Sequence, residues 1–416
     1  MKKVLPFSHE HLAAMLELYP TPFYIYDERG IRENIRRLFD AFSIFPAFRE
    51  YFAVKAAPNP HLLKIFKEEG CGVDTSSLAE LLLAERVGFR DKDIYLTSND
   101  TPAVEFQKAQ ALSANINLDD IRHIDFVERV CGALPPFLSF RYNPGPLRTG
   151  NDIIGNPAEA KYGFTRDQLF EGYELVRKKG VRKFGIHTMV ASNELNADYF
   201  LVTAEMMFDL VAELKRELDI DISVINLGGG LGIPYFPEDK AIDLFALARG
   251  MKALYDEKIT GNGLIPATVA FESGRLMTGP YGYLVTSVLH KKETYKDYLG
   301  LDACMADLMR PALYGAYHHI TPIGKENEPR KHKYDVTGSL CENNDKFAID
   351  RYLPEIEVGD TLVFHDVGAH GHAMGFNYNG KLRPAEVLWQ GGKESKLIRR
   401  AETIDDYFAT LDFNTL

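Results

Sequence analysis

The first candidate for chemistry in this chain is a lysine at the end of a short apolar run. The stretch Tyr51-Phe-Ala-Val-Lys-Ala-Ala-Pro-Asn-Pro60 is typical of a buried strand that ends near Lys55, because two prolines then stop it. Burial disfavours a charged amine, and a neutral, partly buried amine is the form that adds to an aldehyde. We therefore expect Lys55 to be partly buried and neutral, although on this stretch alone a surface lysine at a strand tip is the simpler interpretation.

Two later motifs add the groups that would accompany such a lysine. Gly228, Gly229 and Gly230 follow an apolar run, and the backbone N–H groups of a glycine turn approach a phosphate closely. Glu272 follows another apolar run and precedes Arg275. Alone, the first motif is a flexible turn and the second an ion pair. Together, an amine for an aldehyde, glycines for a phosphate and an acid for a ring nitrogen are the groups that hold pyridoxal phosphate.

The elements that must position these residues alternate regularly. A short strand at residues 20–27 precedes a helix at 31–42, after which apolar runs alternate with helical patterns. Eight such strands predict a closed (β/α)8 barrel of the α/β class. An open doubly wound sheet is the alternative, but no glycine-rich dinucleotide motif follows the first strand. The predicted strands end near Lys55, Asp74, Thr97, Leu118, Arg141, Val190, Leu227 and Glu272.

In such a barrel the active site lies at the carboxyl ends of the strands. Residues at those ends are therefore candidates to line the site beside the lysine, the glycines and the acid. They are Asp74, Arg141, His187, Met189 and Ser192.

The pattern changes after about residue 280, where strand-like segments separated by turns replace the helical patterns. We predict a barrel domain at residues 28–280 and a β domain at residues 281–416, which also takes in residues 1–27 and resembles a Greek-key barrel. In the β domain, Arg310 precedes Tyr314 by one helical turn, and Cys341 stands directly before Glu342. Cys341 is either a proton donor or a small buried core residue.

Composition excludes several classes of protein. The chain has 48 Lys and Arg residues against 59 Asp and Glu, a net charge of −11, and no long basic run, so nucleic acid is not an expected partner. No apolar stretch approaches the roughly 20 residues that span a bilayer, and the N-terminus lacks the apolar core of a signal peptide. The four cysteines are widely spaced, which favours a reduced, cytoplasmic protein, and no histidine pair has a third ligand, so no metal is expected.

The order and spacing of the motifs resemble the diaminopimelate decarboxylases, which belong to the alanine-racemase-like (fold type III) enzymes that use pyridoxal phosphate. The resemblance runs from about residue 20 to 412. It implies decarboxylation of meso-2,6-diaminopimelate to L-lysine and CO2, the last step of lysine biosynthesis, by a homodimer with shared active sites. Its most specific parts are FAVKA, NLGGG, ESGR, DACMADLMRPALYGAYHHI, LCENND and FNYNGKLRPAEVL.

The resemblance also implies a role for each matching residue. Lys55 binds the cofactor aldehyde, Glu272 pairs with the ring nitrogen, and Cys341 donates a proton in the barrel of the partner subunit. The other implied cofactor-binding residues are Asp74, Arg141, Met189, Ser192, Gly228, Gly229, Gly230, Arg275 and His370. The implied substrate-binding residues are Arg275, Arg310, Tyr314, Glu342 and Tyr378.

Two positions depart from the family's pattern. Met189 replaces the second histidine of H-x-H-I-G-S, which stacks on the cofactor ring, and a thioether can cover that face instead. His370 replaces the tyrosine of G-A-Y and can still donate to a phosphate. These changes leave room for another amino-acid substrate, although the paired arginines would repel a distal cation such as that of ornithine. A racemase, which needs a second acid or base at Cα, and a cofactor-free binding module are the further alternatives.

Overall fold

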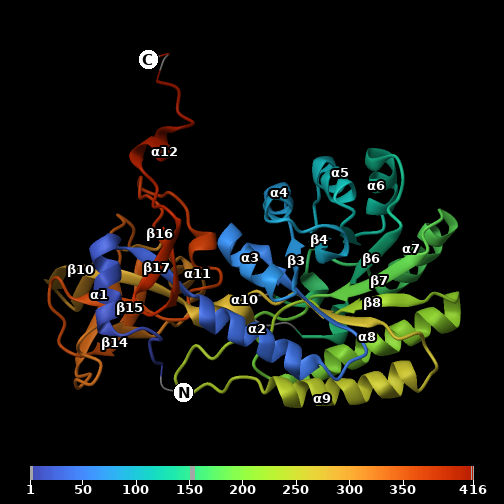
Figure 1. Cartoon of the computed structure of the whole chain (residues 1–416), viewed down its shortest axis with the longest axis horizontal. Helices are drawn as coiled ribbons and strands as arrows, with labels where there is room; N and C mark the ends of the chain where they lie inside the picture. The colour runs from blue at the N-terminus through green and yellow to red at the C-terminus, as the bar shows by residue number, and fades with distance from the viewer. Residues whose placement is uncertain (1–2, 150–154, 414, 416) are drawn as a thin grey trace. The chain divides into compact units, whose positions relative to one another are not determined.

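The computed structural model describes residues 3–149, 155–413 and 415. Contacts divide the chain into two compact units (Figure 1), which we call the barrel unit and the β unit. The barrel unit comprises Arg32–Ile233 and Ala241–Met277, and the β unit comprises Met1–Ile31, Pro234–Lys240 and Thr278–Leu416. The short segment Pro234–Lys240 lies within the predicted barrel range, yet it packs with the β unit.

The barrel unit is built on a closed ring of parallel strands. In the described residues the ring runs in sequence order from β2 to β9, and β9 pairs with β2 to close it. Each strand is short, and its inward side chains fill the interior, which is why the runs in the sequence are almost wholly apolar. The strands are β2 (Phe48–Ala53), β3 (Gly72–Thr75), β4 (Ile94–Thr97), β5 (Asn115–Leu118), β6 (Phe137–Tyr142), β7 (Lys183–Thr188), β8 (Ile222–Asn226) and β9 (Thr268–Phe271).

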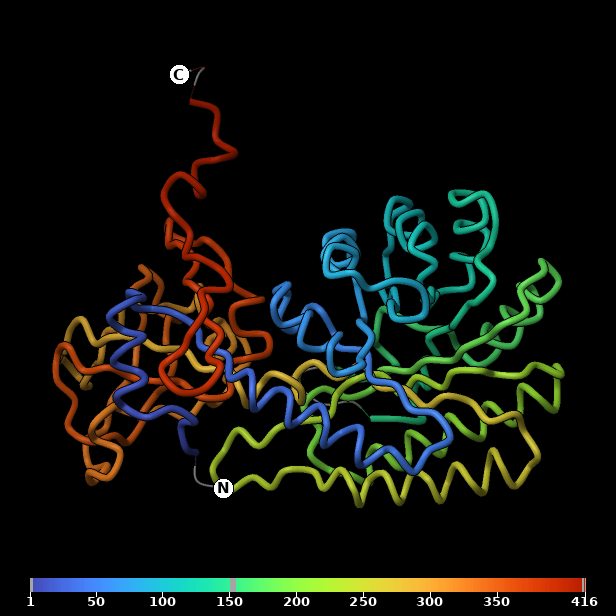
Figure 2. Tube along the Cα trace, in the orientation of Figure 1, coloured from blue at the N-terminus to red at the C-terminus, as the bar shows by residue number. Residues whose placement is uncertain are grey.

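Helices cover the outside of the ring, and the trace in Figure 2 alternates between an inner strand and an outer helix. The first of them, α2 (Glu28–Phe42), buries Ile35, Leu38 and Phe42, which recur at three- and four-residue spacing. The ring of Phe42 stacks on Phe48 of β2, with centroids 4.6 Å apart. The other helices are α3 (Pro60–Glu68), α4 (Leu78–Val87), α5 (Ala103–Ala111), α6 (His123–Cys131), α7 (Arg166–Lys178), α8 (Ala197–Leu218), α9 (Leu244–Tyr255) and α10 (Arg275–Thr278).

The β unit contains a mixed sheet in which the N-terminal strand is central. β1 (Phe23–Asp27) pairs antiparallel with β10 (Gly282–Glu293) and parallel with β16 (Ala385–Gly391). Helix α1 (His9–Leu18) packs Leu12 and Met15 on this sheet. The remaining elements are β11 (Asp297–Leu301), α11 (Arg310–Tyr314), β12 (Ile320–Pro322), β13 (His332–Thr337), β14 (Lys346–Leu353), β15 (Thr361–Phe364), β17 (Glu394–Arg399) and α12 (Ile404–Phe408).

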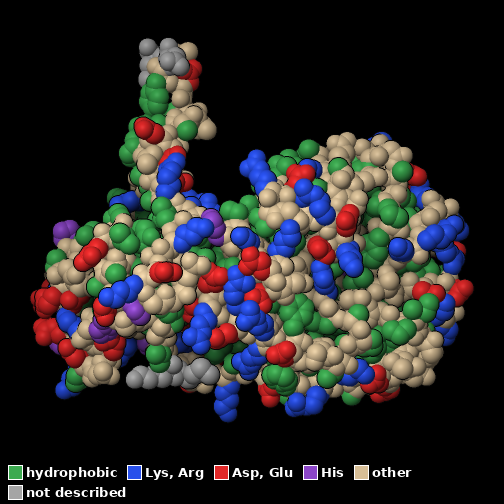
Figure 3. All heavy atoms as spheres, in the orientation of Figure 1, with side chains coloured by type: hydrophobic (Ala, Val, Ile, Leu, Met, Phe, Trp, Pro, Cys, Tyr) green, Lys and Arg blue, Asp and Glu red, His purple; other side chains and the backbone are tan. Residues whose placement is uncertain are grey.

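The predicted fold class, a (β/α)8 barrel with a β domain that takes in the N-terminal strand, is confirmed. Lys, Arg, Asp and Glu side chains are interspersed over the face shown in Figure 3. Among the described helices, none has both the length and the apolar content required to cross a bilayer.

Candidate active site

Glu272 lies directly after β9, and hydrogen bonds hold both of its carboxylate oxygens. Oε1 accepts from Asn226 Nδ2 at 2.8 Å and from Thr97 Oγ1 at 3.3 Å. Oε2 is 3.0 Å from Nε2 of His187. The donors come from the ends of β8 and β4 and from β7, so three strands converge on one carboxylate. Because a carboxylate accepts hydrogen bonds and does not donate them, we place the imidazole proton of His187 on Nε2.

The surroundings of Glu272 keep its carboxyl ionised. Burial alone would raise its pKa, but contact with His187 and the positive charges of Lys55 and Arg141 lower that pKa below its usual value. Burial lowers the pKa of His187, so its imidazole is neutral near pH 7. The result is a fixed negative charge in the barrel, supported by a neutral donor. Such a charge suits a protonated ring nitrogen.

The glycine turn follows β8 and packs tightly against its surroundings. Gly228 has φ +71° and Gly230 has φ +99°, conformations that L side chains rarely adopt. A Cβ on Gly229 would lie 2.6 Å from the carbonyl oxygen of Glu272, and one on Gly230 would lie 2.5 Å from that of Ala191. The turn therefore has no room for side chains, which is a feature of backbone turns that bind anions.

Met189 supports this turn from the end of β7. Its sulfur, Sδ, lies 3.2 Å from the backbone nitrogen of Gly229, which donates to it, and a Cβ on Gly228 would lie 3.2 Å from the same sulfur. The neighbouring N–H of Gly228 donates to Asn226 Oδ1 at 2.9 Å. Asn226 therefore contacts both Glu272 and the glycine turn.

Lys55 follows β2 in a single 3-10 turn, Val54–Ala56, and its side chain is exposed. The expectation of a partly buried lysine is wrong for the protein chain alone. The reason is local: β2 ends at Ala53, and the turn that follows takes the side chain out of the strand's alternation of inward and outward positions. The amine is nevertheless at the carboxyl end of the ring, as predicted.

Asp74 and Arg141 lie near the carboxyl ends of β3 and β6, two strands of the same ring. Asp74 is buried in β3, and burial raises the pKa of its carboxyl well above the ordinary value, reinforced by Glu272 and opposed by Lys55. Arg141 in β6 has its Nε 3.3 Å from Oδ1 of Asp119. Burial raises the pKa of Asp119 to about 6, although Arg141 opposes the shift.

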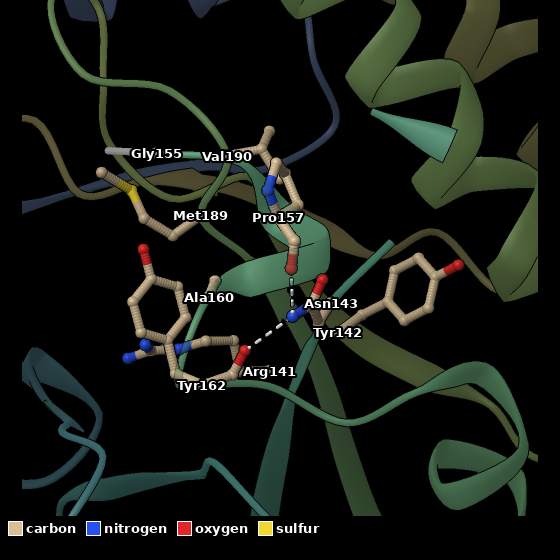
Figure 4. Close-up of a pocket in the computed structure, with 9 residues that line it drawn as sticks. All are labelled: Arg141, Tyr142, Asn143, Gly155, Pro157, Ala160, Tyr162, Met189 and Val190. Carbon is tan, nitrogen blue, oxygen red and sulfur yellow. Dashed lines mark hydrogen bonds between the residues drawn. The ribbon is translucent and has the colours of Figure 1, made fainter. Parts of the chain in front are cut away.

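A small hollow lies beside Arg141, between the segments that follow β6 and β7. Arg141, Tyr162 and Met189 lie together on one side of it (Figure 4), with the guanidinium 4.8 Å from the centre of the Tyr162 ring. Asn143, directly after β6, donates to the carbonyl oxygens of Pro157 and Tyr162, each at 3.0 Å, and so holds that segment at the end of β6. Ser192 lies half-buried just beyond β7.

The remaining predicted residues are divided between the units. Arg275 begins α10 in the barrel unit and is buried. Arg310 is buried in the β unit, with its guanidinium carbon 5.5 Å from the ring centre of Tyr235 and 5.8 Å from that of Tyr314. His370 is half-buried with φ +56°, and the Tyr378 ring is exposed.

Cys341 is exposed, so the thiol is not a core residue. Its backbone N–H donates to Oδ1 of Asn379 at 3.0 Å. Its neighbour Glu342 accepts from the N–H of Asn344 at 3.1 Å, and Asp345 accepts from the N–H of Leu340 at 2.7 Å. The loop that carries Cys341 is therefore held from both sides.

Sequence reasoning missed several residues of the site. Asn226 and Thr97 were not selected, although both stand at strand ends, where the same rule that selected Asp74 would have found them. Asn379 gave no such signal, because its contact with Cys341 joins residues far apart in the sequence.

The barrel residues fit pyridoxal phosphate. Three groups lie at the carboxyl ends of strands in one ring: the glycine turn, which has no room for side chains, the buried and ionised Glu272, and the exposed amine of Lys55. This fold and this set of groups define a barrel-type enzyme that uses pyridoxal phosphate. Residues 29–279 match the family model of the pyridoxal-dependent decarboxylases, at its pyridoxal-binding domain.

Several named proteins are similar to this chain in sequence or structure over almost its whole length. The chain is 43% identical to Protein TabA of Pseudomonas amygdali pv. tabaci, over 95% of this chain and 92% of that one. It is 36% identical to the diaminopimelate decarboxylase of Methanothermobacter thermautotrophicus, over 93% and 91%. The crystal structure of diaminopimelate decarboxylase from M. jannaschii superposes with a TM-score of 0.88 at 30% identity, covering 96% of this chain and 93% of that one.

This chain therefore belongs to the pyridoxal-dependent decarboxylase family. It is a carboxy-lyase that uses pyridoxal phosphate and acts on a small-molecule amino-acid substrate.

Proposed function

We propose that the protein decarboxylates meso-2,6-diaminopimelate to L-lysine and CO2. The observation that supports this substrate most directly is that relatives named diaminopimelate decarboxylase align over more than nine-tenths of this chain, both units included. The reaction is the last step of lysine biosynthesis. The free state of all four cysteines is in keeping with the cytoplasm, which we propose as its location.

The proposed substrate carries a carboxylate and an ammonium at its distal end. Arg310 and Arg275 supply two guanidinium groups, and both side chains are buried. Arginine forms paired hydrogen bonds with a carboxylate, so we assign these two residues, with Tyr314, to the distal carboxylate. A substrate that ends in an ammonium alone would meet unfavourable charge there.

Lys55 would bind the cofactor aldehyde, the glycine turn and His370 would bind the phosphate, and Glu272 would pair with the ring nitrogen. Asp74, Arg141 and Ser192 would line the cofactor, and Met189 would cover one face of its ring. When bound, pyridoxal phosphate supplies an acceptor for the electron pair that remains when CO2 departs. The fixed charge of Glu272 makes that acceptor effective, because it keeps the ring nitrogen protonated.

The loop of Cys341 supplies the second half of the proposed site. The exposed thiol gives a proton to Cα after CO2 leaves, Glu342 contacts the substrate amine, and Tyr378 lies against the substrate. We propose that this loop acts in the barrel of a second protomer, so that the active form is a homodimer. A mixture of Lys55→Ala and Cys341→Ala chains, denatured and refolded together, should then regain activity that neither variant has alone. Activity that stays absent in the mixed dimers would contradict shared sites.

The substrate is tested by comparing kcat/KM for meso-diaminopimelate, L-lysine, L-ornithine and L-arginine. The proposal predicts a preference of at least 100-fold for meso-diaminopimelate. Replacing Arg310 by Met should remove most of that preference, because it removes charge and keeps length. A decarboxylase of another amino acid is the second candidate, favoured by the 43% identity to Protein TabA, whose name states no substrate. A higher kcat/KM for any other amino acid would establish it.

A further inference from the structure

A buried glutamate closes the seam of the barrel. Strands β2 and β9 pair in register from Phe48 and Val269 to Glu50 and Phe271, and the ladder between them ends there. Beyond Phe271, the next backbone N–H of this segment that points toward β2 belongs to Ser273. It donates to the side chain of Glu50, with Oε1 at 2.7 Å. The side chain of Glu50 therefore supplies the acceptor that a backbone carbonyl would supply if the pairing of β2 and β9 continued.

This seam joins the two strands whose ends carry the principal cofactor groups. Lys55 follows β2, and Glu272 lies between β9 and the anchored residue Ser273. Residues 272–274, directly after β9, are closely packed and have little room to shift. A Cβ on Gly274 would lie 2.7 Å from the Cβ of Ala56, and the carbonyl of Glu272 abuts Gly229 of the glycine turn. A displacement of Ser273 would therefore move Glu272 relative to both the turn that carries Lys55 and the glycine turn.

Glu50 is in an environment that favours its neutral form. Its exposed fraction is 0%, and burial raises the pKa of its carboxyl well above the ordinary value. The charges of Glu272 and Asp74 raise that pKa further, while Ser273 opposes the shift. Among the described residues, Oε2 makes no hydrogen bond, which a neutral carboxyl tolerates better than a carboxylate. A neutral Glu50 leaves Glu272 as the ionised acid of this cluster.

We infer that Glu50 is a positioning residue: through the hydrogen bond that it accepts from the Ser273 N–H, it fixes the backbone after Glu272 and so sets that acid against Lys55 for cofactor binding. The inference rests on the proposed roles of Lys55 and Glu272. It assigns Glu50 no contact with cofactor or substrate.

The test compares the dissociation constant for pyridoxal phosphate of wild type, E50L, E50Q and E50D, measured by visible absorption after removing and restoring the cofactor. E50Q keeps a neutral acceptor at the same reach, E50D keeps the acid but shortens it, and E50L removes the acceptor. The matched control is E105L, because Glu105 is also buried and accepts the N–H of Leu78 at 2.9 Å, but it joins α5 to the start of α4. Thermal unfolding of each variant is recorded in parallel.

We expect E50L and E50D to weaken cofactor binding by about 10-fold or more, since each leaves a buried N–H without its acceptor. E50Q should stay within about threefold of wild type and show the same visible band and pH profile. E105L should lower the unfolding temperature with unchanged affinity. Wild-type affinity in both E50L and E50D would overturn the inference. So would an E50Q as weak as E50L, or an E105L that loses as much affinity as E50L.

The readout keeps this inference separate from the proposed substrate. An enzyme that binds pyridoxal phosphate but does not decarboxylate diaminopimelate would refute the substrate and leave the comparison of affinities intact. Loss of kcat alone, with unchanged affinity in E50L, would contradict the positioning role.

Discussion

His187 donates from Nε2 to Oε2 of Glu272 across 3.0 Å inside the barrel, and both side chains are buried. The pair is asymmetric, because burial keeps the imidazole neutral while the carboxyl stays ionised. A neutral donor stabilises the carboxylate without cancelling its charge. That charge is what a protonated ring nitrogen requires.

Removing the donor should weaken the cofactor site. His187→Ala leaves Oε2 of Glu272 without this hydrogen bond, which raises the pKa of Glu272 and lowers affinity for pyridoxal phosphate by about 10- to 100-fold, the usual effect of a lost bond to a charged group. His187→Gln keeps an N–H donor and should retain most of the affinity. Titration of the cofactor-free protein, followed by visible absorption, measures both. Equal affinity in wild type and His187→Ala would refute this role.

Met189 should contribute through its sulfur and its bulk. Met189→Ala removes the acceptor of the Gly229 N–H and the group proposed to cover the ring, so cofactor affinity should fall about 2- to 10-fold. Met189→Leu keeps the bulk but not the sulfur and should lie between alanine and wild type. Met189→His, the residue of the family's pattern, should bind the cofactor. The same titration decides, and an alanine variant that binds as well as wild type would show that Met189 plays no part.

Asn379 should control the proposed proton donor. Its side chain accepts the N–H of Cys341, and its own φ is +51°, which asparagine and glycine tolerate. Asn379→Asp keeps the acceptor and should stay close to wild type, whereas Asn379→Gly keeps the backbone and loses the acceptor. We expect the glycine variant to lose about 2- to 10-fold in kcat, with its visible cofactor band unchanged. A loss of cofactor binding instead would place Asn379 in a different role.

Stability should depend on pH through Glu50. Because the folded-state pKa lies above the ordinary value of 4.5, the folded protein holds a proton that the unfolded chain releases, and stability falls as pH rises from 4.5 toward the folded-state pKa. Glutamine carries no such proton. The charged or titratable groups that face Glu50 are Glu272, Asp74 and Cys71. The unfolding temperature of E50Q relative to wild type should therefore increase between pH 4 and pH 8, and a difference that is constant with pH would contradict a neutral Glu50.

The sequence predicted the ring and the residues at its rim for a physical reason. Parallel strands buried on both faces are short apolar runs, and a polar residue that ends such a run has few places to lie except the rim. Asp74, Arg141 and Glu272 were found in this way. The exposure of Lys55 was not, because a single 3-10 turn leaves no periodic signal.

The contact of Glu50 with Ser273 forms only when the ring closes. The pattern of apolar and polar residues along the sequence does not show which distant residues then meet. Glu50 stands between Arg49 and Tyr51 in β2, and alternation alone does not say which of these side chains faces the interior. Its partner Ser273 is 223 positions away and becomes a neighbour only when β9 pairs with β2. The contact of Pro234–Lys240 with the β unit likewise follows from packing.

We propose that Lys55 and the barrel rim bind pyridoxal phosphate for the decarboxylation of diaminopimelate. The most direct measurement records the visible spectrum of wild type and Lys55→Ala, each saturated with cofactor, while meso-diaminopimelate is added and CO2 and lysine are quantified. We expect the wild-type band to change on addition, with release of equal amounts of CO2 and lysine, and we expect neither the change nor the products in Lys55→Ala. Turnover by Lys55→Ala, or a wild-type enzyme that binds the cofactor and releases no CO2, would contradict this proposal.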